Sequence, residues 1–376
     1  MAAIYEDHHE EFRVQVRRFV EREVAPHHPE WEKQGIVPRD VWRKAGDAGL
    51  LCCSVPEEYG GPGGDFVHEA IVVQELMRVN ATGPGFPVHS MVVAPYISKF
   101  GTEKQKKKWL PKMASGELIA AIAMTEPNAG SDLKAITTSA VLKDSTYLIN
   151  GQKTFISNGI NSDLIVTACK TDKQKGVKGI SLIAIESTVE GLTKSKPLNK
   201  IGFSAQDTSE LSMQNIIVPK ENLIGNEDGG FFHMMDNLPQ ERLLIAIRAV
   251  AVLEAMLDET ITYAKDRRAF GQALFDFQNT KFLLAHVKAQ TEMLKIMVAH
   301  YISVHMSGKI SSVEAAIVKL NATEKVTALL DELLQVFGGN GFMADYLIGK
   351  AWVDSRVYSI FGGTNEIMKE IIARDI

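Results

Sequence analysis

Hydrophobic positions recur along the first hundred residues at intervals of three and four, which is the period of an amphipathic helix. One face of the first predicted helix carries Phe12, Val16, Phe19, Val20 and Val24. Pro26 ends that helix, and the same pattern predicts further helices around residues 42–50 and 69–79. A glycine-rich loop at residues 59–65 separates these two. We therefore expect a helical domain over residues 1–117.

From about residue 118 the pattern changes to short β-branched runs between turn residues, which is typical of strands. Such runs occupy residues 118–125, 137–142, 147–149, 154–157, 164–169, 180–185, 210–213 and 216–218. Asn150-Gly151 lies between two of them and favours a hairpin turn, since both residues tolerate positive φ. We expect a β domain over residues 118–228.

After Gly229-Gly230 the helical period returns and continues to the C-terminus. An apolar stripe runs along the next predicted helix and consists of Leu243, Ile247, Val250, Leu253, Leu257 and Ile261. Further helices are predicted at residues 279–307 and 313–337, the second preceded by Ser311 and Glu314 at the spacing of a capping box. Long helices joined by short loops indicate a bundle over residues 229–376.

The composition, with 45% hydrophobic and 23% charged residues among 376, is that of an ordinary globular protein of two to three domains. A net charge of −5 predicts no general affinity for nucleic acid or anionic membranes, so the lysines at residues 104–112 indicate a solvated helix face. Cys52, Cys53 and Cys169 have neither a disulfide-framework nor a zinc-site spacing. No apolar run approaches the roughly 18 residues of a membrane span.

Cellular location is predicted from the first 24 residues, which are rich in acids and already show the period of a core helix. They match neither a signal peptide nor a transit peptide. We expect a bacterial-type cytoplasmic chain, or a mitochondrial matrix chain if the protein is eukaryotic and processed.

General motifs do not identify a ligand. Residues 339–344 match the GxGxxG/A fingerprint, but the preceding residues are helical and no βαβ unit surrounds them, so a Rossmann site is rejected. The pairs His8-His9 and His27-His28 lie in polar surroundings and are interpreted as exposed residues, and no metal site is expected.

Six polar and glycine-rich segments remain, at residues 125–132, 155–159, 240–242, 267–272, 337–341 and 361–366. Each alone is typical of a turn or a cap, and residues 240–242 alone are typical of a first helical turn. Together and in this order, they resemble the acyl-CoA dehydrogenase family over essentially the whole chain. Residues 124–132 and 267–271 are similar to its two signature regions, and residues 361–370 are similar to its long-chain members.

This resemblance implies a multi-domain α+β fold with three parts: an N-terminal α-helical domain, a middle β-barrel domain and a C-terminal four-helix bundle. It also implies noncovalently bound FAD and a homotetramer built as a dimer of dimers. Hydroxyl groups and open glycine backbone suit close approach to the oxygens of a flavin nucleotide.

The resemblance assigns the cofactor contacts to three sets of residues. The flavin is lined by Ile122, Ala123, Met124, Thr125, Gly130 and Ser131 and flanked by Phe155, Ile156 and Ser157. The adenosine half, held across a subunit boundary, contacts Arg267, Phe270, Gln278, Gln335, Gly338 and Gly339. Thr364 and Glu366 act from the C-terminal end of the same subunit.

The family's reaction removes the α-proton of an acyl-CoA thioester while a hydride leaves the β-carbon for the flavin, giving a trans-2-enoyl-CoA. Many members carry the base directly before a Gly-Thr pair near the C-terminus, where this sequence has Gly362. Long-chain and isovaleryl members instead place a glutamate before an arginine on the long helix, which matches Glu241 and Arg242. By this resemblance Glu241 is the base, although an exposed carboxylate in a first helical turn remains the alternative.

Substrate contacts follow from the same resemblance. They are Ser131, Phe232, Arg242, Gly362 and Gly363, and the backbone N–H of Gly362 polarises the thioester oxygen together with a flavin ribityl hydroxyl. Phe232 is expected to be a pocket wall, with core packing as the alternative. Pro239 stands where some relatives have a substrate-binding aspartate, which leaves part of the CoA contact unassigned.

The predicted function is therefore that of an FAD-dependent acyl-CoA dehydrogenase in fatty-acid β-oxidation, passing electrons to electron-transferring flavoprotein. Two alternatives are an acyl-CoA oxidase that reduces oxygen and a non-catalytic acyl-CoA-binding protein on the same fold. Glu241 beside a substrate arginine argues against the second. Chain length and branching of the acyl group depend on pocket shape and are not predicted.

Overall fold

The computed structural model describes residues 4–376, and its contacts divide the chain into two compact units. One, here called the sheet unit, consists of Glu21–Glu69 and Gly83–Leu238. The other, here called the bundle unit, consists of the chain up to Val20, Ala70–Thr82 and Pro239–Ile376. The division falls inside two helices, α4 (Phe66–Arg78) and α7 (Gly230–Asp266). The three consecutive domains expected from the sequence stay a prediction.

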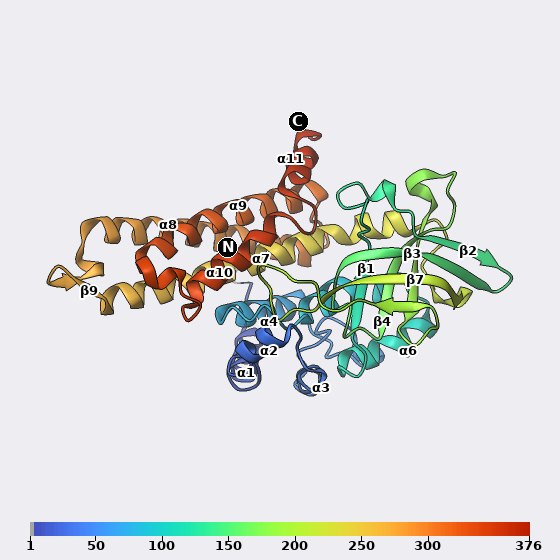
Figure 1. The fold of residues 1–376 in the computed structure, drawn as a ribbon, viewed down its shortest axis with the longest axis horizontal. Coiled ribbons are helices and arrows are strands. Elements are labelled where there is room, and N and C mark those ends of the chain that lie inside the picture. The colour runs from blue at the N-terminus through green and yellow to red at the C-terminus, as the bar shows by residue number, and fades with distance from the viewer. Residues whose placement is uncertain (1–3) are drawn as a thin grey trace. The chain divides into compact units, whose positions relative to one another are not determined.

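The sheet unit is built on a mixed eight-stranded sheet in the order β6-β7-β3-β2-β4-β5-β8, with β1 parallel to β4. Its strands are β1 (Ala120–Ala123), β2 (Ser139–Lys143), β3 (Thr146–Ser157), β4 (Leu164–Lys170), β5 (Ile180–Glu186), β6 (Leu192–Lys194), β7 (Thr208–Pro219) and β8 (Leu223–Ile224). The long strands β3 and β7 run antiparallel and side by side (Figure 1). The strand period in the sequence is confirmed, although β6 and β8 were not predicted.

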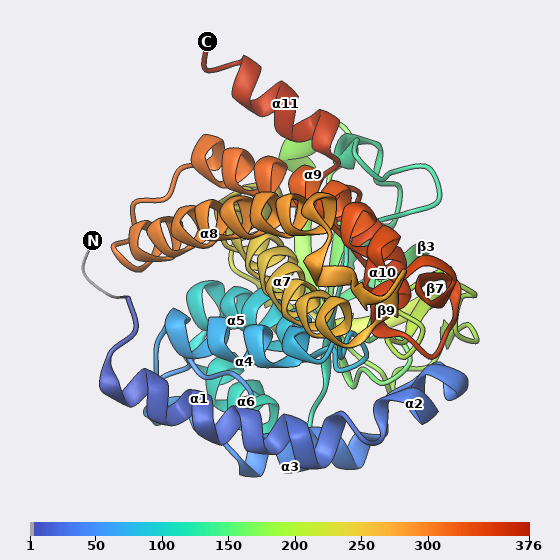
Figure 2. The same cartoon turned by 90° about the vertical axis from the view of Figure 1, so that its left-hand side faces the viewer.

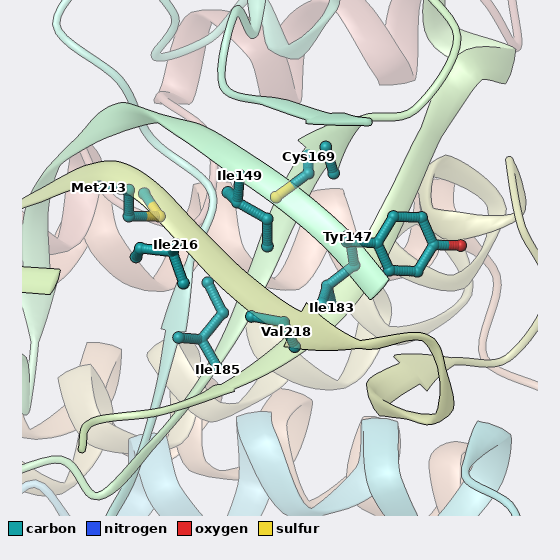
Figure 3. Close-up of a cluster of buried hydrophobic side chains, with 9 residues drawn as sticks. Tyr147, Ile149, Cys169, Ile183, Ile185, Met213, Ile216 and Val218 are labelled. Carbon is teal, nitrogen blue, oxygen red and sulfur yellow. The ribbon is translucent and has the colours of Figure 1, made fainter. Parts of the chain in front are cut away.

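One side of this sheet packs into a hydrophobic core. Figure 3 shows Ile149, Ile183, Ile185, Ile216, Met213 and Val218 gathered between strands, with Cys169 and Tyr147 beside them. All are at most 2% exposed. Tyr147 donates its hydroxyl hydrogen to Glu227 at 3.0 Å, so its polar end has a partner. Strand β4 is buried at every residue, which explains its largely apolar sequence.

The prediction of a hairpin at Asn150-Gly151 is wrong, because both residues lie inside the continuous strand β3. The register of β3 against β7 shifts between Ile149 and Gly151, as in a β-bulge. A Cβ atom on Gly151 would lie 2.3 Å from Thr138 Oγ1, so glycine is needed here for close approach to the residue that precedes β2. The dipeptide therefore serves a bulge and not a turn.

Short helices complete the sheet unit. They are α2 (His28–Gln34), α3 (Arg39–Asp47), α5 (Ala94–Phe100) and α6 (Glu103–Ala114). Thr102 and Gln105 form a capping box at the start of α6, and the lysines of residues 104–112 fall on this helix as expected. His28 is only 7% exposed and its Nε2 accepts the N–H of Gly83 at 3.0 Å, so its interpretation as a surface residue is wrong.

His89 connects the end of α6 with the start of β1. Its ring is fully buried, Nε2 donates to the Met113 carbonyl at 3.0 Å, and Nδ1 accepts the N–H of Ala120 at 3.0 Å. These partners require the neutral ring, because protonation would set two donors against each other at Nδ1. Burial accordingly lowers the pKa of His89 to about 4.

Acid is therefore expected to destabilise the protein through His89. Between pH 6.5 and 4 the unfolded imidazole binds a proton that the folded one does not, so stability falls as pH falls through this window. The loss reaches at most about 3 kcal/mol by pH 4. Denaturant unfolding at several pH values should show a shallower pH dependence for His89→Gln, whereas the same change at the exposed His300 should leave it unaltered. Equal slopes in His89→Gln and wild type would contradict this.

The bundle unit is dominated by three long helices, α7 (Gly230–Asp266, its first residues in the sheet unit), α8 (Gln278–Met306) and α9 (Ser312–Phe337). Helices α8 and α9 run side by side (Figures 1 and 2), and α10 (Leu347–Ser355) and α11 (Asn365–Ala373) also contact α9. The unit also includes α1 (Asp7–Phe19), most of α4 (Phe66–Arg78) and the small hairpin β9 (Arg268–Ala269) to β10 (Gln272–Ala273). None of the helices in residues 4–376 has the length and apolarity needed to cross a bilayer.

Helix boundaries in this unit follow the sequence signals closely. Ser311 Oγ accepts the N–H of Glu314 at 3.1 Å and the Glu314 carboxylate accepts the N–H of Ser311 at 2.8 Å, which confirms the capping box. Helix α1 continues into a π-helical turn at Val20–Val24. Residues 338–342 form a 3-10 turn after α9, which confirms that the glycine motif there is not a Rossmann loop. His9 is 3% exposed, contrary to its interpretation as a surface residue.

Candidate active site

Glu241 lies about three turns into α7, because this helix begins at Gly230 and not beside Glu241. The alternative of an exposed carboxylate in a first helical turn is therefore wrong. The Glu241 residue is half-buried. Ile245 follows four residues later and so shares its face of α7. Whatever packs on Ile245 thus lies near Glu241.

The Gly362-Gly363 turn packs on that same face. A Cβ atom on Gly362 would lie 2.4 Å from Ile245 Cδ1, so the backbone at Gly362 contacts the side chain one turn beyond Glu241. Both glycines have left-handed backbone conformations, with φ of 63° and 92°. A residue with a side chain is disfavoured there on both grounds. The structure therefore places the turn that the sequence assigned to the thioester one helical turn along α7 from the residue assigned to the base.

Arg242 is buried beside Glu241, with only 4% of its surface exposed. One guanidinium nitrogen donates to Ser312 Oγ at 3.0 Å, while Nε has no hydrogen-bond partner among the described residues. Burial lowers the pKa of Arg242, and the charge of Glu241 partly opposes that shift. The arrangement leaves one buried N–H that could be satisfied by a bound ligand.

Lys319 of α9, which sequence reasoning missed, forms hydrogen bonds to the segment that contains the Gly362-Gly363 turn. Its side chain is fully buried, and Nζ donates to the Gly363 carbonyl at 2.8 Å and to Asn365 Oδ1 at 2.9 Å. Thr364 is the N-cap of α11, with Oγ1 accepting the N–H of Ile367 at 3.4 Å. Glu366 is exposed in the first turn of α11. The signal in the sequence was a lysine within the alanine-rich stripe of α9.

A second group of predicted residues lies in the sheet unit, at the end of β1. Ala123 is buried, Ile122, Met124 and Thr125 are half-buried, and Ser131 is exposed. The chain between them turns tightly, since the backbones of Glu126 and Ala129 exchange two hydrogen bonds of 3.0 Å. A Cβ atom on Gly130 would meet nothing within 4 Å, so this backbone is open to a ligand.

Phe155 of β3 combines a left-handed backbone with a largely exposed aromatic side chain. It has φ of 58° and is 69% exposed, whereas Ile156 beside it is buried. The register of β3 against β7 shifts between Lys153 and Ile156, which breaks the alternation of the strand. The bulge therefore turns an aromatic ring outward while its neighbours stay in the core. Ser157, two residues on, is half-buried and pairs with Thr208 of β7.

A buried ion pair that was not predicted fixes this region. Lys153 Nζ donates to Glu126 Oε1 and to the Met124 carbonyl, both at 2.9 Å, and the two side chains are 0% and 3% exposed. Glu126 also accepts the N–H groups of Thr137 at 2.7 Å and Thr138 at 3.0 Å. Burial alone would raise the pKa of Glu126, but the Lys153 charge and these hydrogen bonds lower it to about 2.

The sequence is similar to known proteins along nearly its whole length. Family models described as the N-terminal, middle and C-terminal domains of acyl-CoA dehydrogenase match residues 6–117, 121–216 and 228–376. The chain belongs to the acyl-CoA dehydrogenase family. Members with that name are oxidoreductases acting on a CH–CH group, and this chain is an enzyme of the same kind. The family assignment and the helical, sheet and helical architecture predicted from the sequence are confirmed.

Individual relatives cover nearly the whole chain. The long-chain specific acyl-CoA dehydrogenase of Mus musculus mitochondria is 44% identical over 99% of this chain and 87% of its own length. An acyl-CoA dehydrogenase structure from Geobacillus kaustophilus is 44% identical with a TM-score of 0.98, covering 100% of this chain and 99% of that one. A structure titled for the electron transferring flavoprotein of Acidaminococcus fermentans is 34% identical with a TM-score of 0.96, covering 100% and 99%.

Apart from Phe232, which lies at the start of α7 in the sheet unit, the remaining residues of the acyl-CoA dehydrogenase prediction lie near ends of the long helices in the bundle unit. Four of them are exposed side chains, namely Arg267, Phe270, Gln278 and Gln335. Phe270 is 98% exposed in the two-residue turn of the β9–β10 hairpin. Cβ atoms on Gly338 and Gly339 would meet nothing within 4 Å. Phe232, at 56% exposure, is not a core residue. The cofactor and substrate roles of all these residues stay predictions.

Proposed function

We propose that the protein catalyses FAD-dependent α,β-dehydrogenation of an acyl-CoA thioester to a trans-2-enoyl-CoA, with Glu241 as the base. The observation that carries the proposal is the packing of the Gly362 backbone on Ile245, one helical turn from Glu241. A carboxylate on the helix face against which a backbone N–H packs suits proton removal next to a carbonyl group. The family relation supports the same chemistry.

In the proposed mechanism, Glu241 accepts the α-proton as the carbon–hydrogen bond breaks. Negative charge then develops on the thioester oxygen, where the N–H of Gly362 donates a hydrogen bond that strengthens with that charge. The buried cation of Arg242 contacts the substrate and adds a favourable field. Burial of the acyl chain excludes water, and desolvation strengthens a carboxylate as a base. FAD, when bound, supplies the redox chemistry by taking the hydride from the β-carbon.

The sheet-unit residues fit a flavin. A largely exposed aromatic ring at Phe155, an open backbone at Gly130 and an exposed hydroxyl at Ser131 provide a stacking surface and polar contacts. We assign flavin binding to residues 122–125, 130–131 and 155–157. Arg267, Phe270, Gln278, Gln335, Gly338 and Gly339 are assigned to the adenosine half of a cofactor shared between subunits, with Thr364 and Glu366 completing the set.

The proposed assembly is a homotetramer, a dimer of dimers. Large hydrophobic side chains exposed on α8 support it, since Phe282, Met293 and Ile296 are 65%, 66% and 50% exposed. Met293 and Ile296 are three residues apart and so share a face of α8, and exposed apolar patches are typical of protein interfaces. The proposed electron acceptor is an electron-transferring flavoprotein, and the proposed pathway is fatty-acid β-oxidation in the bacterial cytoplasm or, for a processed chain, the mitochondrial matrix. The three domains are proposed at residues 1–117, 118–228 and 229–376.

An acyl-CoA panel tests the proposal directly. We expect the purified protein to carry FAD and to lose flavin absorbance under anaerobic conditions with one chain-length class of saturated acyl-CoA, giving the matching enoyl-CoA. Turnover with electron-transferring flavoprotein should then exceed oxygen consumption by at least about tenfold. Flavin-free protein, or flavin that no acyl-CoA bleaches, would contradict the proposal. Rapid oxygen uptake without an added acceptor would instead identify an acyl-CoA oxidase.

A further inference from the structure

Lys319 is a buried cation whose hydrogen-bond partners are neutral. Within the described residues no carboxylate lies within ion-pair distance of its Nζ, and its two acceptors are the Gly363 carbonyl and the Asn365 side-chain oxygen. Thr323 Oγ1 lies 3.1 Å from the same Asn365 oxygen. A buried lysine without a paired carboxylate is costly to keep, so its retention points to a specific use.

Electrostatics around Lys319 add to that cost. Burial lowers its pKa to about 8, and the neighbouring cation Arg242 pushes in the same direction, while the charges of Glu366 and Glu324 oppose it only in part. Replacing such a group by an apolar one is often neutral or stabilising for folding. The position of Lys319 is therefore poorly explained by stability alone.

The contacts of Lys319 all converge on one short segment. Its Nζ joins the carbonyl of Gly363 to the side chain of Asn365, and these residues flank Thr364, the N-cap of α11. On its other side the segment contacts α7 through Gly362 and Ile245. Two successive glycines with positive φ give this segment little conformational preference of its own. Its geometry must be imposed from outside, and Lys319 supplies two of the bonds that do so.

We infer that Lys319 is a positioning residue that holds the Gly362-Gly363 turn so that the Gly362 N–H polarises the substrate thioester. The inference rests on the proposed function, because it takes the thioester oxygen as the acceptor of that N–H. A hydrogen-bond donor aimed at developing charge is effective only when it is fixed before the reaction. Lys319 does not touch the reacting atoms, and it acts through the backbone that it anchors.

Lys319→Met is the main test, and Lys325→Met is its matched control, since Lys325 is an exposed lysine of the same helix. We expect Lys319→Met to lower kcat by about tenfold to a hundredfold. KM for acyl-CoA and FAD content should stay within about threefold of wild type, because positioning affects the transition state more than ground-state binding. Lys325→Met should match wild type in all three. Lys319→Gln, which keeps an N–H donor, should show a smaller loss and serves if the methionine variant does not fold.

A spectroscopic readout separates positioning from general damage to the fold. The carbonyl stretch of bound, carbonyl-13C-labelled enoyl-CoA should shift to lower frequency in wild type, and Lys319→Met should lose at least half of that shift. Hydrogen–deuterium exchange should quicken at residues 360–365 in the variant and stay unchanged in the long helices. A normal kcat with a full carbonyl shift in Lys319→Met would overturn the inference.

Failure of the proposed function gives a different result. If no acyl-CoA bleaches the wild-type flavin, the dehydrogenase proposal falls, and with it the part of the inference that concerns the thioester. The anchoring of the turn is then judged by hydrogen exchange alone. Unaltered hydrogen exchange at residues 360–365 in Lys319→Met would then also overturn the anchoring of the turn by Lys319.

Discussion

A Glu241→Gln variant is expected to reduce its flavin with acyl-CoA about a thousandfold more slowly than wild type. The amide has nearly the same shape as the carboxylate but cannot accept the α-proton. Because Glu241 lies about three turns inside α7 and is half-buried, the substitution should leave the helix intact. Anaerobic stopped-flow absorbance measures the rate, and titration of the flavin spectrum with enoyl-CoA measures binding, which should change by less than about threefold.

Glu259→Gln is the matched control for Glu241→Gln. It makes the same substitution on the same helix at another half-buried glutamate, whose pKa is raised by burial. We expect Glu259→Gln to reduce its flavin at the wild-type rate. If Glu241→Gln also did so, the base would have to be sought elsewhere, and the assignment of the family's alternative position to this chain would be wrong.

Moving the carboxylate from position 241 to position 362, where many relatives carry their base, is expected to require an additional substitution at Ile245. In Glu241→Gly/Gly362→Glu the Cβ atom of the new glutamate would lie 2.4 Å from Ile245 Cδ1. Its backbone would also have to keep the φ of 63° that Gly362 has. Adding Ile245→Val removes that Cδ1 atom. We therefore expect the triple variant to recover more activity than the double variant, while both stay below wild type because the left-handed backbone is still strained.

Lys153→Met is expected to destabilise the sheet unit by about 3 to 5 kcal/mol, because it leaves the charge of Glu126 buried without its partner. The variant also removes the hydrogen bond from Lys153 to the Met124 carbonyl, which lies in the segment assigned to the flavin. We therefore expect loss of FAD together with loss of stability. Denaturant unfolding and the flavin-to-protein absorbance ratio measure the two effects.

The controls for this pair use its electrostatics. Lys143→Met, at an exposed residue of β2, should change the free energy of unfolding and the FAD content little. Lys153→Met/Glu126→Leu should recover part of the lost stability, because no unpaired charge remains buried. The pKa of Glu126 is lowered to about 2, so its stabilising contribution is present above pH 4.5 and is lost as pH falls towards 2. Lys153→Met should lose most of that acid dependence. A change in unfolding free energy below 1 kcal/mol would contradict the argument.

Local signals in the sequence predicted much of this fold. The apolar stripe from Leu243 to Ile261 runs along α7, and the capping box at Ser311 and Glu314 starts α9 where it was expected. Fully buried β4 matched its β-branched run almost residue for residue. These features depend on neighbours within a few positions, which is why one sequence is enough to find them.

Features that depend on distant partners were not predictable in this way. Gly151 looked like a turn residue, but Thr138, which directly precedes β2, decides its role. Lys153 has the sequence surroundings of an ordinary surface lysine, and although Lys319 interrupts an alanine-rich stripe, only the fold brings Glu126 and Gly363 to these two lysines. His28 likewise becomes buried because the backbone at Gly83 binds its ring. The cofactor and substrate residues came from family resemblance, because their ligands leave no periodic signal in the chain.

The bulge at Asn150-Gly151 also has a consequence for chemical ageing. Asn-Gly is the dipeptide most prone to deamidation, which requires the glycine nitrogen to attack the asparagine side-chain carbonyl and close a five-membered ring. Here Asn150 pairs with Ser139 of β2, and its side-chain oxygen accepts the N–H of Asn215 at 2.8 Å. This pairing and hydrogen bond hold the side-chain carbonyl away from the attack and slow ring closure while β3 stays formed. Isoaspartate at position 150 would therefore record how often the strand has opened, and not how long the protein has been stored.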